Sequence, residues 1–175
     1  MKKVITALFI LLLIGAAALQ PASAISADSI QVSFSPNGGT RDKIISRINL
    51  SKKSIKIAIF SLTSGEIAWA LESAKKRGVD VRIVADLSQS RGKHSEIAYL
   101  QKKGLKIKIA KGKGRGIMHN KFAVFDEREV VTGSYNWTDN AEKNNYENAI
   151  FLKGEEIVQA FNREFDVLYY DKFIR

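Results

Sequence analysis

The sequence contains no cysteine, and this absence excludes three kinds of chemistry. Without a thiol the chain can form no disulfide bond, no thiolate zinc site and no cysteine nucleophile. The chain also has little proline and glycine, 2 and 12 residues respectively, which excludes collagen-like and low-complexity sequence. The 175 residues are 45% hydrophobic and 26% charged, and this composition is typical of a single folded globular domain.

Acidic residues are outnumbered by basic ones. There are 18 Asp and Glu against 28 Lys and Arg, so the formal net charge is +10. Polyanions are therefore the first partners to consider.

The N-terminal segment has the three-part layout of a secretory signal peptide. Two lysines precede a charge-free apolar stretch over residues 4–19, and Ala22-Ser23-Ala24 follows as a cleavage site. We expect residues 1–24 to be removed and residues 25–175 to form one exported domain, periplasmic or secreted. The alternative is an uncleaved membrane anchor, because the apolar stretch is only slightly shorter than a membrane span.

The first half of the remaining chain alternates between two periodicities. Strand-like alternation is followed each time by a helix-like apolar face. Thr40 is expected to cap the first helix, and the next two helices are expected to cover residues 64–77 and 93–103. The predicted strands cover residues 30–34, 55–60, 79–85 and 105–109. This order indicates parallel strands joined by crossover helices.

The pattern changes in the second half. Residues 118–125 and 129–132 have hairpin spacing, residues 146–152 form a further strand, and residues 155–170 form an amphipathic helix. We therefore predict one α/β domain built on a mixed, largely parallel β-sheet with helices on both faces.

The residues that point to chemistry begin at His119. In a strand, side chains two residues apart share a face, so His119 and Lys121 are expected to point the same way. Together they offer a nucleophile for phosphorus and a positive charge for its non-bridging oxygens. Asp126 has the opposite parity and lies at the strand end, which favours a role in a turn or in an interface salt bridge.

Further polar residues follow the predicted hairpin. Ser134 and Asn136 are two residues apart and can donate hydrogen bonds to phosphate oxygens. Glu147 is the best-placed carboxylate to hold His119 by its second ring nitrogen and to stabilise the imidazolium.

Residues 118–151 resemble a known family. His119-Asn-Lys-Phe-Ala-Val-Phe-Asp126, followed by Thr-Gly-Ser-Tyr-Asn-Trp and Asn-Asn-Tyr-Glu-Asn, is similar to the H-x-K-x4-D signature of the phospholipase D superfamily, above all to its small exported bacterial endonucleases with one motif per chain. The resemblance implies a phospholipase D-like fold and a covalent phosphohistidine mechanism with no metal and no cofactor.

The resemblance also assigns roles to residues. His119 would match the nucleophile, and Lys121, Ser134 and Asn136 would match the phosphate-binding residues. Glu147 would match the carboxylate partner of the histidine. Asp126 would match the third signature residue, which places it among the catalytic candidates.

One motif supplies one histidine, whereas larger relatives use two. His94 lacks a lysine two residues later and is expected to be a histidine on a helix surface. The general acid is therefore expected to be His119 of a second subunit, across the two-fold axis of a homodimer. Both protonation states are accessible because histidine ordinarily titrates near pH 6.5.

A basic segment precedes the motif. Residues 106–116 contain five basic residues, three glycines and no acid, and Lys111, Lys113 and Arg115 lie in its last part. Such a segment is either a solvated loop or a surface that binds a nucleic-acid backbone beside the site.

Three functions remain open on the sequence. The leading hypothesis is a non-specific endonuclease acting on DNA or RNA, without stable membrane association after signal cleavage. The alternative enzyme is a phospholipase D or phosphatidyl transferase. We expect no exposed apolar stripe on the mature chain, and this expectation argues against an enzyme that acts at a bilayer. The third is a basic nucleic-acid-binding protein with an inactive motif, which the complete residue set disfavours.

Overall fold

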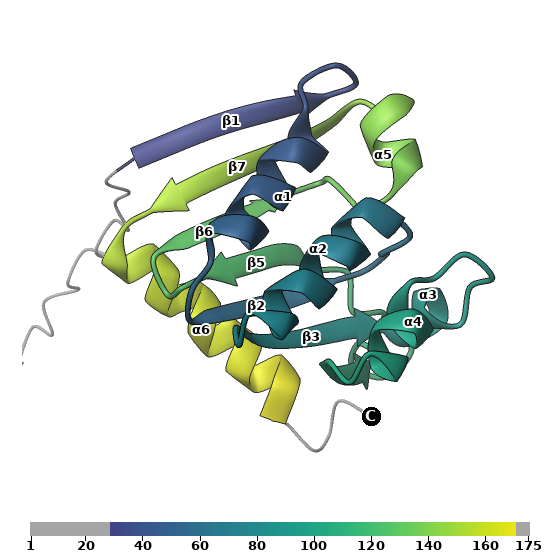
Figure 1. Cartoon of the computed structure of the whole chain (residues 1–175). Helices are drawn as coiled ribbons and strands as arrows, with labels where there is room; N and C mark the ends of the chain where they lie inside the picture. The colour runs from purple at the N-terminus through teal and green to yellow at the C-terminus, as the bar shows by residue number, and fades with distance from the viewer. Residues whose placement is uncertain (1–28, 171–175) are drawn as a thin grey trace, which may run out of the picture.

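The computed structural model describes residues 29–170, which form one mixed sheet with helices on both faces (Figure 1). The sheet has seven strands in the order β1-β7-β6-β5-β2-β3-β4. The strands are β1 Ser29–Ser35, β2 Ser54–Ile59, β3 Asp80–Asp86, β4 Lys106–Ala110, β5 Lys121–Phe125, β6 Glu129–Gly133 and β7 Glu147–Lys153.

Helices cover the two faces unequally. The helices are α1 Thr40–Leu50, α2 Gly65–Lys76, α3 Leu87–Ser90, α4 Ile97–Lys102, α5 Asp139–Lys143 and α6 Glu155–Tyr170. Apolar side chains of α1, α2, α4 and α5 pack with Ile55, Ile57 and Ile59 in one cluster, and α6 packs with Phe122 and Val124 in the other. Because β5 alternates Phe122 and Val124 with Ala123 and Phe125, each face of this central strand is buried.

The predicted α/β domain with a mixed sheet is confirmed, but the sheet is not largely parallel, because four of its six strand pairs are antiparallel. β2, β3 and β4 form the parallel part, whereas β5, β6, β7 and β1 are joined by antiparallel pairs. β1 points in the same direction as β2 but lies at the far edge, next to β7. The connection through α1 therefore crosses three strands, a displacement that local periodicity does not encode.

Three local predictions were wrong. The helix expected over residues 93–103 begins only at Ile97, and a separate short helix, α3, precedes it. Thr40 is the first residue of α1 and does not cap it, since the N-cap is Gly39 and the Thr40 hydroxyl contacts Ser33 Oγ at 2.9 Å. The strand expected from residue 118 begins at Lys121.

β1 exposes an apolar stripe, which we call the β1 stripe. Ile30, Val32 and Phe34 have exposed fractions of 64%, 47% and 64%, while Ser33 and Ser35 between and beside them are buried. These apolar residues lie opposite Leu152, Ile150 and Asn148 of β7, so they share the sheet face of α6. The expectation that the mature chain has no exposed apolar stripe is therefore wrong.

The predicted signal peptide, residues 1–24, lies outside the described residues. Within residues 29–170, none of the helices has the length and apolar character needed to cross a bilayer.

Candidate active site

The ends of five strands meet at one end of the sheet and bring one aromatic and four polar residues there. β2, β3 and β6 end there, while the antiparallel strands β5 and β7 begin there. Phe60, Asp86, Lys121, Ser134 and Glu147 are consequently brought to the same edge, although 87 residues separate the first from the last. Ligand sites in open α/β sheets occur at such strand ends.

Phe60 is the shared neighbour of His119 and Lys121. The rings of Phe60 and His119 meet edge to face with centroids 4.5 Å apart, and the Lys121 ammonium lies 5.1 Å from the Phe60 ring centroid. Lys121 Nζ also donates to the His119 carbonyl at 2.9 Å. His119 itself is exposed and lies just before β5, so contacts with Phe60, in place of regular strand geometry, hold the imidazole and the ammonium together.

The ammonium group of Lys121 is half-buried, and its pKa is lowered as a result. Burial lowers the pKa of its ammonium below the ordinary 10.5, and the negative charge of Glu147 opposes that shift in part. Glu147 is therefore close enough to Lys121 for their charges to interact. A half-buried cation at a strand end is suited to stabilising an anion that binds there.

Ser134 and Glu147 are brought together directly. Ser134 Oγ donates to Glu147 Oε2 and accepts from the backbone N–H of Asn148 at 3.1 Å. Asn145 Nδ2 donates to the other carboxylate oxygen at 3.0 Å. Within the described residues of one chain, these bonds account for the Glu147 carboxylate, and none goes to the His119 imidazole. The orienting role of Glu147 toward His119 stays a prediction.

Asn136 carries a buried polar atom without a partner. Its Oδ1 is enclosed and forms no hydrogen bond within the described chain. An unpaired buried polar group costs about 1–3 kcal/mol, so it calls for a functional explanation. Turning the amide by 180° would place two N–H donors at this position instead. The phosphate-binding role of Asn136 stays a prediction.

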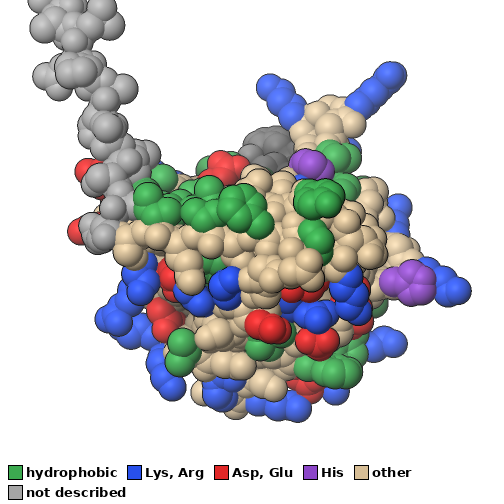
Figure 2. Space-filling view, turned by 90° about the horizontal axis from the view of Figure 1, so that it is seen from above, with side chains coloured by type: hydrophobic (Ala, Val, Ile, Leu, Met, Phe, Trp, Pro, Cys, Tyr) green, Lys and Arg blue, Asp and Glu red, His purple; other side chains and the backbone are tan. Residues whose placement is uncertain are grey.

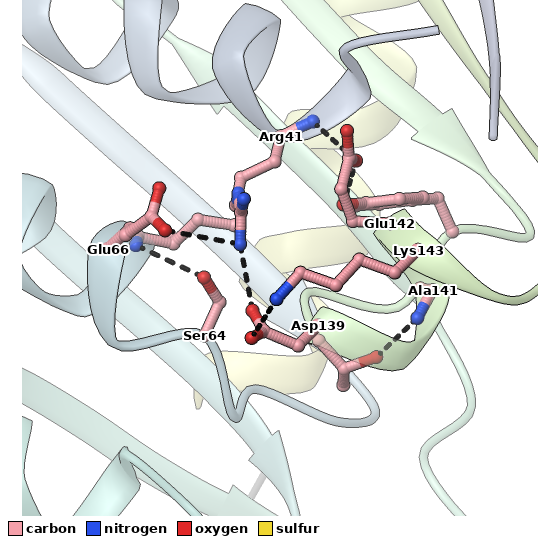
Figure 3. Close-up of polar contacts among 10 residues, drawn as sticks. Arg41, Ser64, Glu66, Asp139, Ala141, Glu142 and Lys143 are labelled. Carbon is pink, nitrogen blue, oxygen red and sulfur yellow. Dashed lines mark hydrogen bonds and ion pairs between the residues drawn. The ribbon is translucent and has the colours of Figure 1, made fainter. Parts of the chain in front are cut away.

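A polar network holds the segment between β6 and β7 against the first two helices (Figure 3). Arg41 Nη1 contacts Asp139 Oδ1 at 2.8 Å and Glu66 Oε1 at 3.3 Å, and its backbone N–H donates to Glu142 Oε2 at 3.0 Å. Tyr135 donates to the same Glu142 oxygen at 2.7 Å. Since Tyr135 is buried in the core, its part is packing and anchoring of the segment that carries Asn136 and Glu147.

Asp86 is a site residue that the sequence analysis missed. It is only 1% exposed, and its Oδ2 accepts the backbone N–H of Met118 at 3.0 Å. Its Oδ1 accepts the backbone N–H groups of Ser88 and Gln89 at 2.8 and 3.1 Å. Asp86 thereby fixes the chain directly before His119. The sequence did contain a signal for Asp86: an aspartate at the end of a predicted strand, followed by Leu-Ser-Gln-Ser, is typical of a helix N-cap.

Asp126 lies at the opposite end of β5 from Lys121. Its carboxylate accepts the backbone N–H groups of Lys52, Lys53 and Ser54 at 2.7–3.1 Å. Burial raises the pKa of Asp126, but these three donors outweigh burial and the net pKa is lowered. About 16 Å of strand separates the two ends. The inclusion of Asp126 among the catalytic residues was therefore wrong, and its role is to secure the turn that precedes β2.

The basic loop lies next to His119. Lys111, Lys113 and Arg115 are all exposed on the connection from β4 to β5, which ends at the site. In Figure 2, basic side chains project from the surface beside the exposed histidines. His94 is exposed too, but it lies in the turn before α4 and not on a helix.

The described residues contain no cluster of three or more His, Asp or Glu side chains with the spacing of a metal site. Lys121 places a positive charge at these strand ends.

Comparisons with known proteins agree with this geometry. The family model described as "Cardiolipin synthase, PLD-like domain" matches residues 44–169. The chain is 34% identical over 139 residues to a phospholipase D of Rickettsia conorii, covering 79% of this chain and 68% of that protein. It is 31% identical over 135 residues to the mitochondrial cardiolipin hydrolase of Canis lupus familiaris, covering 77% of this chain and 52% of that protein.

A solved structure has the same fold. Nuc from Salmonella typhimurium, described as a phospholipase D family member, superposes with a TM-score of 0.75 at 34% identity, covering 81% of this chain and 94% of that one. The chain spans about half the length of the cardiolipin hydrolase. With His119 and Lys121 at the strand ends and the family model covering most of the sequence, this chain belongs to the phospholipase D superfamily of phosphodiesterases.

Proposed function

We propose that this protein is an exported endonuclease that hydrolyses phosphodiester bonds of DNA or RNA without sequence preference. The observation that carries the proposal is the basic loop, whose exposed Lys111, Lys113 and Arg115 directly precede His119. Cations that contact backbone phosphates bind nucleic acids irrespective of sequence. The net charge of +10 supports the same class of substrate.

The proposed reaction has two steps. The His119 imidazole attacks phosphorus, the bond to the leaving nucleoside oxygen breaks, and a phosphohistidine forms. Lys121, Ser134 and Asn136 stabilise the charge on the non-bridging oxygens. A second imidazolium gives its proton to the leaving oxygen and, now neutral, takes a proton from the water that hydrolyses the phosphohistidine.

We propose that the second imidazolium is His119 of another copy of the chain. The sequence has two histidines, and His94 lies on an exposed turn without a neighbouring lysine at the second position. A two-fold axis brings identical surfaces together, so it can place two copies of His119 on one phosphate. Glu147 of either copy then has the chemistry to orient an imidazole.

A second candidate is hydrolysis or transfer of phosphatidyl groups. The β1 stripe favours it, because exposed apolar side chains can contact a lipid surface. The names of the Rickettsia and Canis relatives point to the same class of substrate. The same His119 chemistry applies to a lipid phosphodiester.

One pair of assays tests the two functions. Purified protein is incubated in parallel with supercoiled plasmid and with phosphatidylcholine or cardiolipin vesicles. We expect nicking and then degradation of the plasmid, and defined single- and double-stranded oligonucleotides establish the strand preference. Turnover of lipid without any cleavage of nucleic acid contradicts the proposal.

We expect activity to persist in millimolar EDTA. Lys121 provides the positive charge that a divalent cation provides in metal-dependent phosphodiesterases. The measurement is the initial rate on plasmid with and without EDTA, after dialysis against the chelator. Loss of activity that added Mg²⁺ or Zn²⁺ restores would contradict the phosphohistidine mechanism.

The lowered pKa of Lys121 predicts how phosphate binding depends on pH. In a His119→Ala protein, titration calorimetry with inorganic phosphate should show affinity falling at a pH below 10.5, because Lys121 loses its proton earlier than an ordinary lysine. A His119→Ala, Lys121→Arg protein should keep its affinity through this range, since arginine stays protonated. Identical pH profiles for the two proteins would show that Lys121 does not bind the phosphate.

The basic loop should control the salt dependence of DNA binding. Replacing Lys111, Lys113 and Arg115 by Ala should reduce the slope of log K against log salt by about one unit for each lost contact. The matched control replaces Lys52, Lys53 and Lys153, three exposed lysines at the opposite end of the sheet. If both triple variants change the slope equally, net charge and not the loop controls binding.

A further inference from the structure

We infer that a pocket beside His119 binds a second phosphate of the nucleic-acid strand, one linkage away from the phosphate that is cleaved. This inference rests on the proposed function. The pocket has a volume of about 310 Å³ and lies between α3 and the loop from β4 to β5. That volume is at the lower end of the range for sites that bind small ligands.

Three cations line the pocket from two separate segments. Arg91 follows α3, whereas Lys111 and Arg115 belong to the basic loop. Elsewhere in the described chain Arg41, Arg47 and Arg82 form ion pairs with carboxylates. The side chains of Arg91, Lys111 and Arg115 form no ion pair or hydrogen bond with any described residue. Unpaired cations that converge on one pocket are suited to an anion from outside the chain.

The acid in the pocket wall does not cancel this charge. Asp86 is the carboxylate among the lining residues, so the three cations leave a net charge of +2. Its two oxygens already accept hydrogen bonds from Ser88, Gln89 and Met118, and the residue is almost fully buried. Asp86 thus acts as part of the framework, and the exposed charge of the pocket is positive.

The loop that presents Lys111 and Arg115 is a folded turn. The Gly112 N–H donates to the Gly116 carbonyl at 3.1 Å, and the Gly116 N–H donates to the Lys113 carbonyl at 3.0 Å. A side chain at Gly112 would bring its Cβ to 2.6 Å from the Ile117 nitrogen, so the close approach requires glycine. A cation on a turn that is already folded loses less conformational entropy on binding than one on a free segment.

The pocket is adjacent to the reacting group. Ile117 forms part of its wall, and His119 follows two residues later. Two residues of chain span at most about 7 Å between their Cα atoms, so this wall of the pocket is close to the backbone of His119. Successive phosphates of one strand are joined by a single sugar, which gives a spacing of the same order. A strand bound in this way presents one linkage to His119 and the next to Arg91 and Arg115.

The test uses chromogenic dinucleotides in which the leaving group fixes the cleaved bond. Thymidine dinucleotides carry a p-nitrophenyl phosphate at the 3′ or 5′ end, and the internal linkage is either a phosphodiester or an uncharged methylphosphonate. For one of the two ester series we expect kcat/KM to be about tenfold higher with the charged linkage. Arg91→Gln and Arg115→Gln should each bring this ratio close to one.

Lys93→Gln is the matched control, because Lys93 is exposed in the same turn as Arg91 and does not line the pocket. It should keep the wild-type ratio, and thermal melting verifies that all variants fold. A ratio near one for the wild type in both series overturns the inference, as does an equal loss in Lys93→Gln.

The outcome also separates this inference from the proposed function. If the dinucleotide esters are cleaved but show no effect of the internal charge, only the second-phosphate pocket is wrong. If nucleotides are not cleaved and cardiolipin, with two phosphates, is preferred over phosphatidylglycerol in an Arg91-dependent way, the nucleic-acid assignment is overturned.

Discussion

When wild-type and His119→Ala chains are mixed in equal amounts, unfolded and refolded together, activity should fall to about a quarter of that of the wild type. Random pairing makes about a quarter of the dimers fully wild-type and half of them mixed. A mixed dimer has either the nucleophile or the general acid but not both, so it cannot complete the cycle. The His119→Ala homodimer should lose at least about 10⁴-fold in kcat.

The control mixes wild-type and His94→Ala chains, which should retain the full activity because His94 is exposed outside the site. Activity of one half in the His119 mixture would show that each subunit works alone. A monomer in sedimentation velocity that still cleaves DNA would also contradict the shared site. Acid-labile label transferred from a phosphorus-labelled substrate would identify the phosphohistidine.

Replacing Asp86 by Ala should destabilise the protein by about 3 kcal/mol and reduce activity together with stability. The change leaves the backbone N–H groups of Ser88, Gln89 and Met118 without this acceptor, and the bond lost at Met118 is buried. Asp86→Asn is the more specific variant, because it keeps the size of the side chain. Its amide oxygen can still accept from Ser88 and Gln89 or from Met118, but its NH₂ group then faces the other N–H donors. It should lower kcat more than its smaller loss of stability explains, because Met118 directly precedes His119.

Urea unfolding and kcat on bis-p-nitrophenyl phosphate measure the two effects separately. Asp80→Asn is the matched control at the other end of β3, where the carboxylate pairs with Arg82 and Lys106 near the surface. It should cost less than about 1 kcal/mol and leave kcat unchanged. Wild-type kinetics in Asp86→Asn would show that Asp86 stabilises the fold without positioning His119.

The pH dependence of stability should identify the Asp86 contribution. Burial raises the pKa of Asp86, but its hydrogen bonds outweigh burial and the net pKa is below 3.8. A lowered folded-state pKa means that the stabilisation is present above the unfolded pKa and is lost as the pH falls through the folded value. The difference in stability between wild type and Asp86→Asn should therefore be constant near neutral pH and shrink only in acid.

The local pattern of the chain was sufficient to predict most of the elements. Residues Gly65–Lys76 and Glu155–Tyr170 form the predicted helices, because an apolar face at helical spacing has one stable way to be buried. The strands predicted over residues 55–60 and 118–125 correspond to Ser54–Ile59 and to the shorter Lys121–Phe125. The candidate phosphate site was identified from the side-chain chemistry and the two-residue spacing of two pairs, His119 with Lys121 and Ser134 with Asn136.

The tertiary structure decided which of these residues lie together. β1 pairs with β7 at the far edge of the sheet, and strand order depends on contacts between segments more than 100 residues apart, which no local period contains. For the same reason the β1 stripe was missed: alternation predicts a face that needs covering but not whether a helix reaches it. Asp126 and Asp86 illustrate the two kinds of error that result: a residue wrongly placed in the site and a residue missed. The motif placed Asp126 in the site, yet β5 carries it to the opposite end, while Asp86, with no motif of its own, reaches Met118 because β3 and β5 end and begin at the same edge.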